Sequence, residues 1–507
     1  MEINVMKKIV LLPLDERPCN YDFPRRLFTH GSETKIVVPG RLGNKKAPAD
    51  TEQIREFLIE ETKDAQALIL SVDMMLYGGL VPSRIHHIHD AGILKKLAET
   101  LHVIKGNNPK LVIYAFQVIM RCPSYSSSDE EPDYYETCGE QINQAGIMIH
   151  RGRLEINDEK DYREVLARIP EEALSDYVAR RQINCEMNLH MLRYVEDGTI
   201  DFMVIPQDDS AVYGYAAMDQ AQVRSEIIRK GLSEKVLMYP GADEVELTLM
   251  ARLINRMNER KPKVYLKYIS DGAGGIYPLY EGATLAATLK NHVFAAGCQL
   301  TACYENAELI IVVTAPSGEM MEAETQPSRL PGYAAERNLP EMADFIHDRI
   351  LEGRQVTIAD NAYANGADLE VIRLLNQQKL LLSVAGYAGW NTSANTIGTA
   401  IAEGIDALFF GITPEHQDFL VQRYLEDAGY CSVVRWKVAE QLKGTSFSYF
   451  DVGSSKGEIA EKAAAELKEF ADTELSSVSD RMWIDHVSMP WKRMFEIRFD
   501  AGIREGQ

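Results

Sequence analysis

Two adjacent carboxylates, Asp208 and Asp209, directly follow an apolar run in the segment DFMVIPQDDSAVYGY, residues 201–215. Neighbouring carboxylates repel each other, so a fold that places them together must compensate for the charge. Side chains alternate between the two faces along a strand, but at the end of a strand the backbone turns and both carboxylates can reach one ligand. The pair is therefore the first candidate for chemistry.

Three interpretations of the pair compete. In a glycosidase, one acid stays protonated because of its neighbour's charge and protonates a leaving oxygen, while the other stabilises positive charge. In a metal-dependent enzyme, the pair joins Asp15, Asp243 or Glu244 around Mg²⁺ or Mn²⁺, which prefer several oxygen ligands. In the third interpretation, Asp209 caps the next helix and Asp208 faces solvent.

Several other apolar runs end in the same way, in acids, amides, arginine or tryptophan close to glycine. These substrate-binding candidates are Asp15 and Arg17 in LPLDERPCN, Asp73 in LSVDMMLYGG, Arg121 in FQVIMR, Asp243 and Glu244 in YPGADE, Asp360 and Asn361 in IADNAYANG, and Trp390 and Asn391 in AGYAGWN. The carboxyl ends of parallel strands meet at one edge, where ligands bind, so we expect these side chains to converge on a pocket. Helix capping and turn formation are the competing roles for each of them.

The residue types favour a sugar over a phosphate ester. No GxxxxGK[ST] loop, strand-following GxGxxG or HExxH motif occurs in the chain. Asp and Asn pair with hydroxyl groups, and an apolar sugar face can stack on an aromatic ring. Trp390 suits such a platform, although it could instead fill the core.

These observations predict a glycoside hydrolase for a small carbohydrate that needs no cofactor, with Asp209 as general acid and Asp208 as stabiliser. A divalent-metal-dependent hydrolase or phosphoryl-transfer enzyme that uses the same carboxylates is the first alternative. A non-catalytic binding protein for sugars or related metabolites is the second.

Parallel sheets must position these residues. In the N-terminal half, short apolar runs alternate with amphipathic stretches, a pattern typical of parallel strands buried on both faces and joined by helices. Residues 120–200 interrupt the pattern with a polar loop and a long helical region. We interpret them as an insertion, either a substrate-binding element or a spacer.

The alternation resumes after Pro262 and ends with the runs at 380–390 and 406–412, which makes about eleven predicted strands, more than the eight of one barrel. The sequence predicts an α/β protein of two consecutive parallel-sheet domains, or a TIM-like barrel with a smaller α/β domain, and a helical C-terminal part. The predicted boundaries are 1–260 for an N-terminal catalytic domain, 261–412 for a second α/β domain and 413–507 for the helical region.

Composition excludes several classes of partner. The chain has 507 residues with 54 basic and 75 acidic side chains, a formal net charge of −21 that repels nucleic acid and anionic membranes. No segment approaches the roughly 20 apolar residues of a membrane-spanning helix. The seven cysteines contain no CxxC pair, and reduced thiols suit a cytosol. We therefore expect a cytoplasmic protein whose partner is a small-molecule carbohydrate; the oligomeric state stays open.

The combination of segments resembles the uncharacterised bacterial domain-of-unknown-function family 4127. The resemblance rests on LPLDERPCN, SVDMMLYGGLVPSR, PQDDSAVYGY, GADEVELTLMAR, DNAYANGADL, AGYAGWNTSANTIGTA and MPWKRMFEI, which span almost the whole chain. It implies one family-defining unit and no particular activity. Over a few residues, VIPQDDS is also similar to the strand-end Asp-Asp pair of substrate-assisted N-acetyl-hexosaminidases. That likeness implies Asp208 as the acid that orients the acetamido group and Asp209 as the proton donor.

Overall fold

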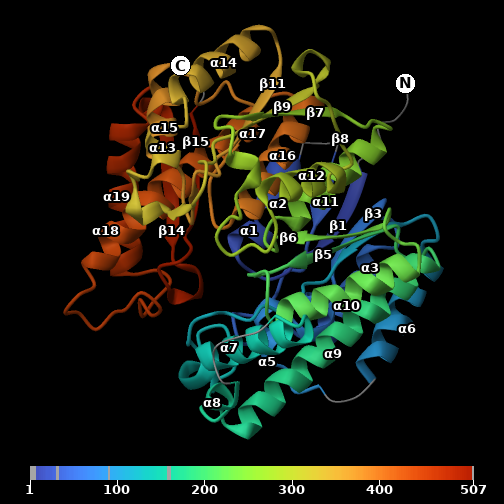
Figure 1. Cartoon of the computed structure of the whole chain (residues 1–507). Helices are drawn as coiled ribbons and strands as arrows, with labels where there is room; N and C mark the ends of the chain where they lie inside the picture. Colours follow the sequence, from blue (N-terminus) through green and yellow to red (C-terminus); the bar gives the residue numbers. More distant parts are fainter. Residues whose placement is uncertain (1–6, 30–33, 89–91, 157–161, 505–507) are drawn as a thin grey trace. The chain divides into compact units, whose positions relative to one another are not determined.

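The chain folds into two compact units, each built on its own parallel sheet. The computed structural model describes residues 7–29, 34–88, 92–156 and 162–504 (Figure 1). The first unit contains Met1–Tyr21, Thr29–Glu246 and Tyr280–Gly282, and the second contains Asp22–Phe28, Leu247–Leu279 and Ala283–Gln507. The predicted α/β class, with parallel sheets flanked by helices, is confirmed.

The first sheet is open, with its six strands in the order β2-β1-β3-β4-β5-β6 and every pair parallel. The strands are β1 (Lys7–Leu12), β2 (Thr34–Val37), β3 (Ala67–Ser71), β4 (Val112–Phe116), β5 (Phe202–Gln207) and β6 (Val236–Pro240). All residues of β3 and β5 are buried, because both faces of these strands are covered. Since β2 and β6 form the two edges, this sheet does not close into a barrel.

The first unit also contains helices. They are α1 (Pro18–Tyr21), α3 (Thr51–Glu61), α4 (Val72–Tyr77), α5 (Leu80–Ile85), α6 (Gly92–Asn107), α7 (Tyr135–Arg153), α8 (Tyr162–Leu166), α9 (Glu171–Glu196) and α10 (Tyr215–Arg229). Leu58 of α3, Leu101 of α6, Val195 of α9 and Ile227 of α10 share one core cluster with Leu70 of β3. The residues between β4 and β5 supply α7, α8 and α9, so the insertion is mainly helical.

The second sheet has the order β13-β11-β9-β7-β8 and is also parallel throughout. Its strands are β7 (Lys263–Tyr268), β8 (Gln299–Leu300), β9 (Leu309–Val313), β11 (Gln355–Ala359) and β13 (Gly386–Ala388), and a short parallel pair joins β10 (Met321–Glu322) to β12 (Tyr363–Ala364). The remaining helices up to residue 410 are α2 (Phe23–Phe28), α11 (Val245–Met257), α12 (Leu285–Ala295), α13 (Pro331–Ala334), α14 (Leu339–Leu351), α15 (Leu369–Gln377) and α16 (Ser393–Phe410).

The strand predicted at residues 406–412 is wrong, because α16 runs through it to Phe410. Every residue of α16 from Ser393 to Ala407 is buried. A helix that is buried on all sides lacks a polar face, so its short apolar run cannot be distinguished from a strand by periodicity.

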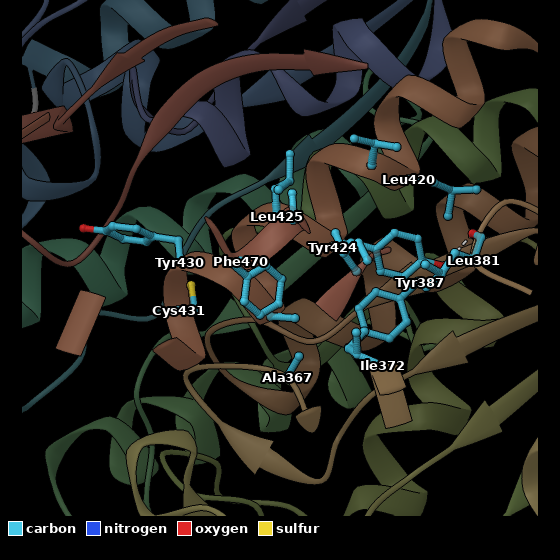
Figure 2. Close-up of a cluster of buried hydrophobic side chains, with 14 of the residues drawn as sticks. Ala367, Ile372, Leu381, Tyr387, Leu420, Tyr424, Leu425, Tyr430, Cys431 and Phe470 are labelled. Carbon is cyan, nitrogen blue, oxygen red and sulfur yellow. Dashed lines mark hydrogen bonds between the residues drawn. The ribbon is translucent and has the colours of Figure 1, made fainter. Parts of the chain in front are cut away.

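The C-terminal part is largely helical, as predicted. It contains α17 (Pro414–Arg423), a π-helix (Tyr424–Val434), α18 (Arg435–Glu440) and α19 (Glu458–Glu474). Figure 2 shows a buried cluster in which residues of α17, the π-helix and α19 pack with residues 367–387. The rings of Tyr387 and Tyr424 lie 4.8 Å apart, and the Tyr424 hydroxyl donates to the Leu381 carbonyl at 2.8 Å. An antiparallel hairpin of β14 (Met482–Ser488) and β15 (Arg498–Ile503), absent from the prediction, follows α19. No helix in the described ranges is long and apolar enough to cross a membrane.

Candidate functional site

The carboxyl ends of the first sheet carry a group of charged side chains from distant parts of the sequence. Asp15 follows β1, Asp73 lies in α4 directly after β3, and Arg121 follows β4. Asp208 and Asp209 follow β5, and Asp243 follows β6. Because the strands are parallel, all these ends lie at the same edge of the sheet, as the sequence predicted.

The Asp208–Asp209 pair is held by two different guanidinium groups. Arg84 Nη2 donates to Asp208 Oδ2 at 2.6 Å, and Arg121 Nη1 donates to Asp209 Oδ2 at 2.9 Å. The side chains of Asp208 and Asp209 are 12% and 28% exposed. The next helix, α10, has Gly214 at its N-cap. The pair therefore does not cap α10, and Asp208 is not simply solvated.

Both arginines are also bound by two glutamates of the insertion. Glu130 accepts from Arg84 Nη1 at 2.8 Å and from Arg121 Nη2 at 3.3 Å. Glu131 accepts from Arg121 Nε at 2.8 Å. The network thus contains four carboxylates, two from the aspartate pair and two from the glutamates, against two guanidinium groups. An excess of buried negative charge favours retention of a proton.

The environment of Asp209 increases its affinity for a proton. Burial, followed by the charge of Asp208, raises the pKa of Asp209 to about 6, although Arg121 acts to lower it. Its backbone has a φ of +21°, an unusual value for a residue other than glycine. Burial also raises the pKa of Glu131.

A second network joins β1 to β6. Arg17 donates through Nε to Asp15 at 2.9 Å and through Nη2 to Asp243 at 2.5 Å, and Asn20 Nδ2 donates to Asp15 at 2.8 Å. Burial raises the pKa of Asp243 to about 6; Arg17 opposes the increase, whereas Asp15 and Asp208 add to it. The charge of Asp208 therefore acts on both networks.

Three further acids at this edge make bonds to the main chain. Asp73 Oδ2 accepts from the Val118 amide at 2.9 Å, and burial raises the pKa of Asp73 to about 7. Glu244, a predicted substrate-binding residue, is fully buried and accepts from the Ala242 amide at 3.0 Å. Glu246 accepts from the Leu14 amide at 2.8 Å.

The remaining predicted site residues belong to the second unit. Asp360 follows β11 and is completely buried; it accepts from the Thr314 hydroxyl at 2.6 Å and the Tyr387 hydroxyl at 2.7 Å. Asn361 is also buried and donates to the Ser393 carbonyl at 3.1 Å. These bonds connect β9, β11, β13 and α16, so both side chains have structural partners within the unit.

Trp390 and Asn391 follow β13. Trp390 is only 7% exposed, donates through Nε1 to Thr399 at 3.2 Å and packs edge-to-face on Phe23 with centroids 5.7 Å apart. Asn391 has a φ of +52°, and its carbonyl accepts from the Asn365 amide at 2.8 Å. In this conformation the ring of Trp390 fills core, which was the competing role considered for it.

Sequence reasoning missed Arg84, Glu130 and Glu131. Arg84 lies in α5, shortly after Gly78 and Gly79 at the end of α4. It follows the helical residues LVPS and not an apolar strand, so the strand-end pattern does not point to it. The two glutamates lie in the polar segment RCPSYSSSDEEPDYYETCGE. Like the two aspartates, these two glutamates are adjacent in the sequence, and they follow Arg121 by only nine and ten residues. This second acidic pair could have indicated that the segment contributes to the site.

The carboxylates required by the metal alternative are arranged differently. Asp15, Asp243 and Asp208 each accept from a guanidinium, and Glu244 accepts from the main chain. In the part of the chain that the structure describes, no group of three or more His, Cys, Asp or Glu side chains could hold a metal ion. These four carboxylates therefore do not form the set of several oxygen ligands that Mg²⁺ or Mn²⁺ requires.

Comparisons with known proteins identify a family and no activity. A search of the curated proteins found no match. Among solved structures, the chain is similar to the carboxyl transferase domain from Rhizobium etli pyruvate carboxylase with 3-bromopyruvate, at 10% identity and a TM-score of 0.20, covering 93% of this chain and 61% of that one. A TM-score of this size does not indicate a shared fold. The model of the family described as "Protein of unknown function (DUF4127)" matches residues 9–500, and the chain therefore belongs to that family.

Proposed function

We propose that the protein is a glycoside hydrolase that acts on a small carbohydrate. Asp209 is the general acid: its proton passes to the leaving oxygen as the glycosidic C–O bond breaks. Asp208, which accepts from Arg84 Nη2 at 2.6 Å, stabilises the positive charge that develops on the sugar. Water then adds its hydroxide part to the anomeric carbon, and its proton restores the Asp209 acid.

The observation that carries this proposal is the unequal environment of two adjacent carboxylates. Asp208 receives a 2.6 Å bond from Arg84 and is 12% exposed. Asp209 shares Arg121 with both glutamates, is 28% exposed and has a pKa raised to about 6 by burial. Two acids of one type in unequal environments are the usual basis of an acid and a stabiliser.

The test is turnover by the Asp209→Asn variant. A panel of aryl glycosides is first screened with the wild-type protein, and the best substrate is then assayed with the variant. Loss of a general acid should lower kcat by about 10²–10⁴-fold. Asp472→Asn is the matched control, because Asp472 is exposed on α19. Unchanged turnover by Asp209→Asn would remove the assignment.

The same screen separates the alternatives. A metal-dependent hydrolase loses its activity with EDTA and regains it with Mg²⁺ or Mn²⁺, whereas the proposed reaction is insensitive to the chelator. A non-catalytic binding protein is stabilised against heat by a sugar but releases no product.

A cytoplasmic location is part of this proposal. All seven cysteines are free, which suits a reducing compartment. Recovery of the protein mainly from a secreted or membrane fraction would contradict it.

A further inference from the structure

The two arginines that hold the aspartate pair are joined to each other by one oxygen of Glu130. Glu130 Oε2 accepts from Arg84 Nη1 at 2.8 Å and from Arg121 Nη2 at 3.3 Å. Arg84 donates in turn to Asp208 at 2.6 Å, and Arg121 donates to Asp209 at 2.9 Å. Since Asp208 and Asp209 are consecutive in the chain, these four hydrogen bonds and the backbone between the two aspartates form a closed ring.

This ring determines how the two carboxylates are oriented. Consecutive side chains of an extended chain point to opposite faces, so a straight continuation of β5 would direct Asp208 and Asp209 apart. At Asp209 the backbone leaves the strand conformation, with a φ of +21°. The guanidinium groups that receive the two carboxylates are kept together by Glu130. The ring can close only when both carboxylates turn toward these joined arginines, so it fixes one orientation for the pair.

Burial makes the contacts of the ring effective. The side chains of Arg84, Arg121 and Glu130 are 2%, 9% and 16% exposed. Water and salt screen buried ion pairs much less than exposed ones, and removal of one partner leaves the other charge unpaired. The loss of Glu130 should therefore displace both arginines, and with them the carboxylates that they hold.

The segment that carries Glu130 is itself held in place. Its neighbour Asp129 forms an ion pair with Lys45. The amide of Ser128 donates to the Glu136 carboxylate of α7 at 2.7 Å. Because these contacts order the segment before any ligand binds, the bridge between the arginines is preformed and needs no rearrangement during a reaction.

We propose that Glu130 is a positioning residue of the site: through Arg84 and Arg121 it holds Asp208 and Asp209 in one relative orientation. This role rests on the proposed glycoside hydrolase activity. Glu130 acts only through the arginines and takes part in no bond that forms or breaks. A displacement of about 1 Å at a catalytic group can lower a rate by about 100-fold, so a small movement of the arginines is enough to affect the reaction.

Two substitutions separate the position of the bridge from its charge. Glu130→Ala removes the bridging oxygen, whereas Glu130→Gln retains an oxygen that can accept from both arginines but carries no charge. With the best substrate of the aryl glycoside screen, we expect Glu130→Ala to lower kcat by about 10–100-fold and to change KM by less than about 3-fold. Glu130→Gln should keep kcat within about 3-fold of the wild-type value, because the bridge is restored.

The pH profile of Glu130→Gln reports the missing charge. Burial and the charge of Asp208 are the main causes of the raised pKa of Asp209, and the charge of Glu130 adds to them. Without that charge, the decrease of kcat/KM at high pH should begin roughly half a pH unit lower than in the wild-type protein. Glu234→Gln is the matched control, because Glu234 is exposed just before β6, and it should leave both kcat and the pH profile unchanged.

Urea unfolding at pH 7.5 tests the ring without a substrate. Asp209→Asn is compared with its parent in two backgrounds, the wild-type protein and Glu130→Gln. Because the charge of Glu130 disfavours the ionised form of Asp209, the change in urea midpoint on Asp209→Asn should be less positive in the Glu130→Gln background. Circular dichroism confirms that each variant is folded.

Four results would overturn the proposal: an unchanged kcat in Glu130→Ala, equal losses of kcat in both Glu130 variants, a wild-type pH profile in Glu130→Gln, or the same change in urea midpoint in both backgrounds. Failure of the proposed hydrolysis has a different signature. In that case Asp209→Asn leaves turnover undiminished, or the screen finds no turnover, and the urea midpoints alone decide whether Glu130 holds the pair.

Discussion

Replacement of Asp209 by asparagine should stabilise the protein at neutral pH while it removes the proposed turnover. The pKa of Asp209 is raised from 3.8 to about 6. The folded state therefore binds this proton more tightly than the unfolded state. The stability that this group contributes is fully present below pH 3.8 and is lost as the pH rises to about 6.

The difference between 3.8 and about 6 corresponds to about 3 kcal/mol at neutral pH. Because the side chain is 28% exposed, solvent screens part of this cost, and we expect a gain of about 1–3 kcal/mol in the free energy of unfolding. Asparagine has nearly the same volume and retains an oxygen that can accept from Arg121 Nη1. The exchange therefore removes a charge without opening a cavity.

Urea unfolding at pH 7.5 and pH 4.5 tests this expectation. The gain for Asp209→Asn should be largest at pH 7.5 and smaller at pH 4.5, where the wild-type acid is already largely protonated in the folded state. Asp472→Asn, at an exposed position of α19, should show no such dependence on pH. If Asp209→Asn is less stable than wild type at pH 7.5, the bond to Arg121 outweighs the burial cost and the reasoning is refuted.

Two further predictions concern the same network. Because the proposed acid must be protonated, kcat/KM should fall about tenfold per pH unit above pH 6 or so; a rate that is flat from pH 5 to 8 contradicts this. Replacement of Arg84 by methionine should destabilise the protein by about 3–5 kcal/mol, since it leaves Asp208 and Glu130 without their shared guanidinium. Urea unfolding at pH 7.5 measures that loss, and a value below about 1 kcal/mol would show that the carboxylates are solvated instead.

The convergence of Asp15, Asp208 and Asp243 could be predicted from the sequence because it follows from strand direction alone. Each acid directly follows an apolar run, and parallel strands that are joined by helices must end at one edge. No knowledge of side-chain packing is needed for this step. The strand predicted at 406–412 was wrong for the opposite reason: periodicity does not distinguish a short apolar run in a strand from one in a helix, and only the packing of α16 decides its conformation.

The partners of the acids could not be predicted in the same way. Arg84 and Asp208 are 124 residues apart, and the choice of Arg84 depends on how α5 packs after α4. Trp390 shows the same limit, because a tryptophan after a strand fits both a sugar platform and a core position. Its contact with Phe23, far away in the sequence, decides in favour of the core in this structure.

The insertion completes an environment that the sheet alone does not supply. The sheet brings both carboxylates to the same edge, where Asp208 receives a guanidinium from Arg84 and Asp209 receives one from Arg121. Glu130 bonds to both arginines, whereas Glu131 accepts from Arg121 Nε at 2.8 Å and lies 3.6 Å from Arg84 Nη1. The two glutamates therefore place further negative charge beside the guanidinium groups that hold the aspartates. Burial and the charge of Asp208 are the main causes of the raised pKa of Asp209, and Glu130 adds to them. The residues between β4 and β5 thus strengthen the hold of Asp209 on its proton, although burial at the end of β5 is the larger cause.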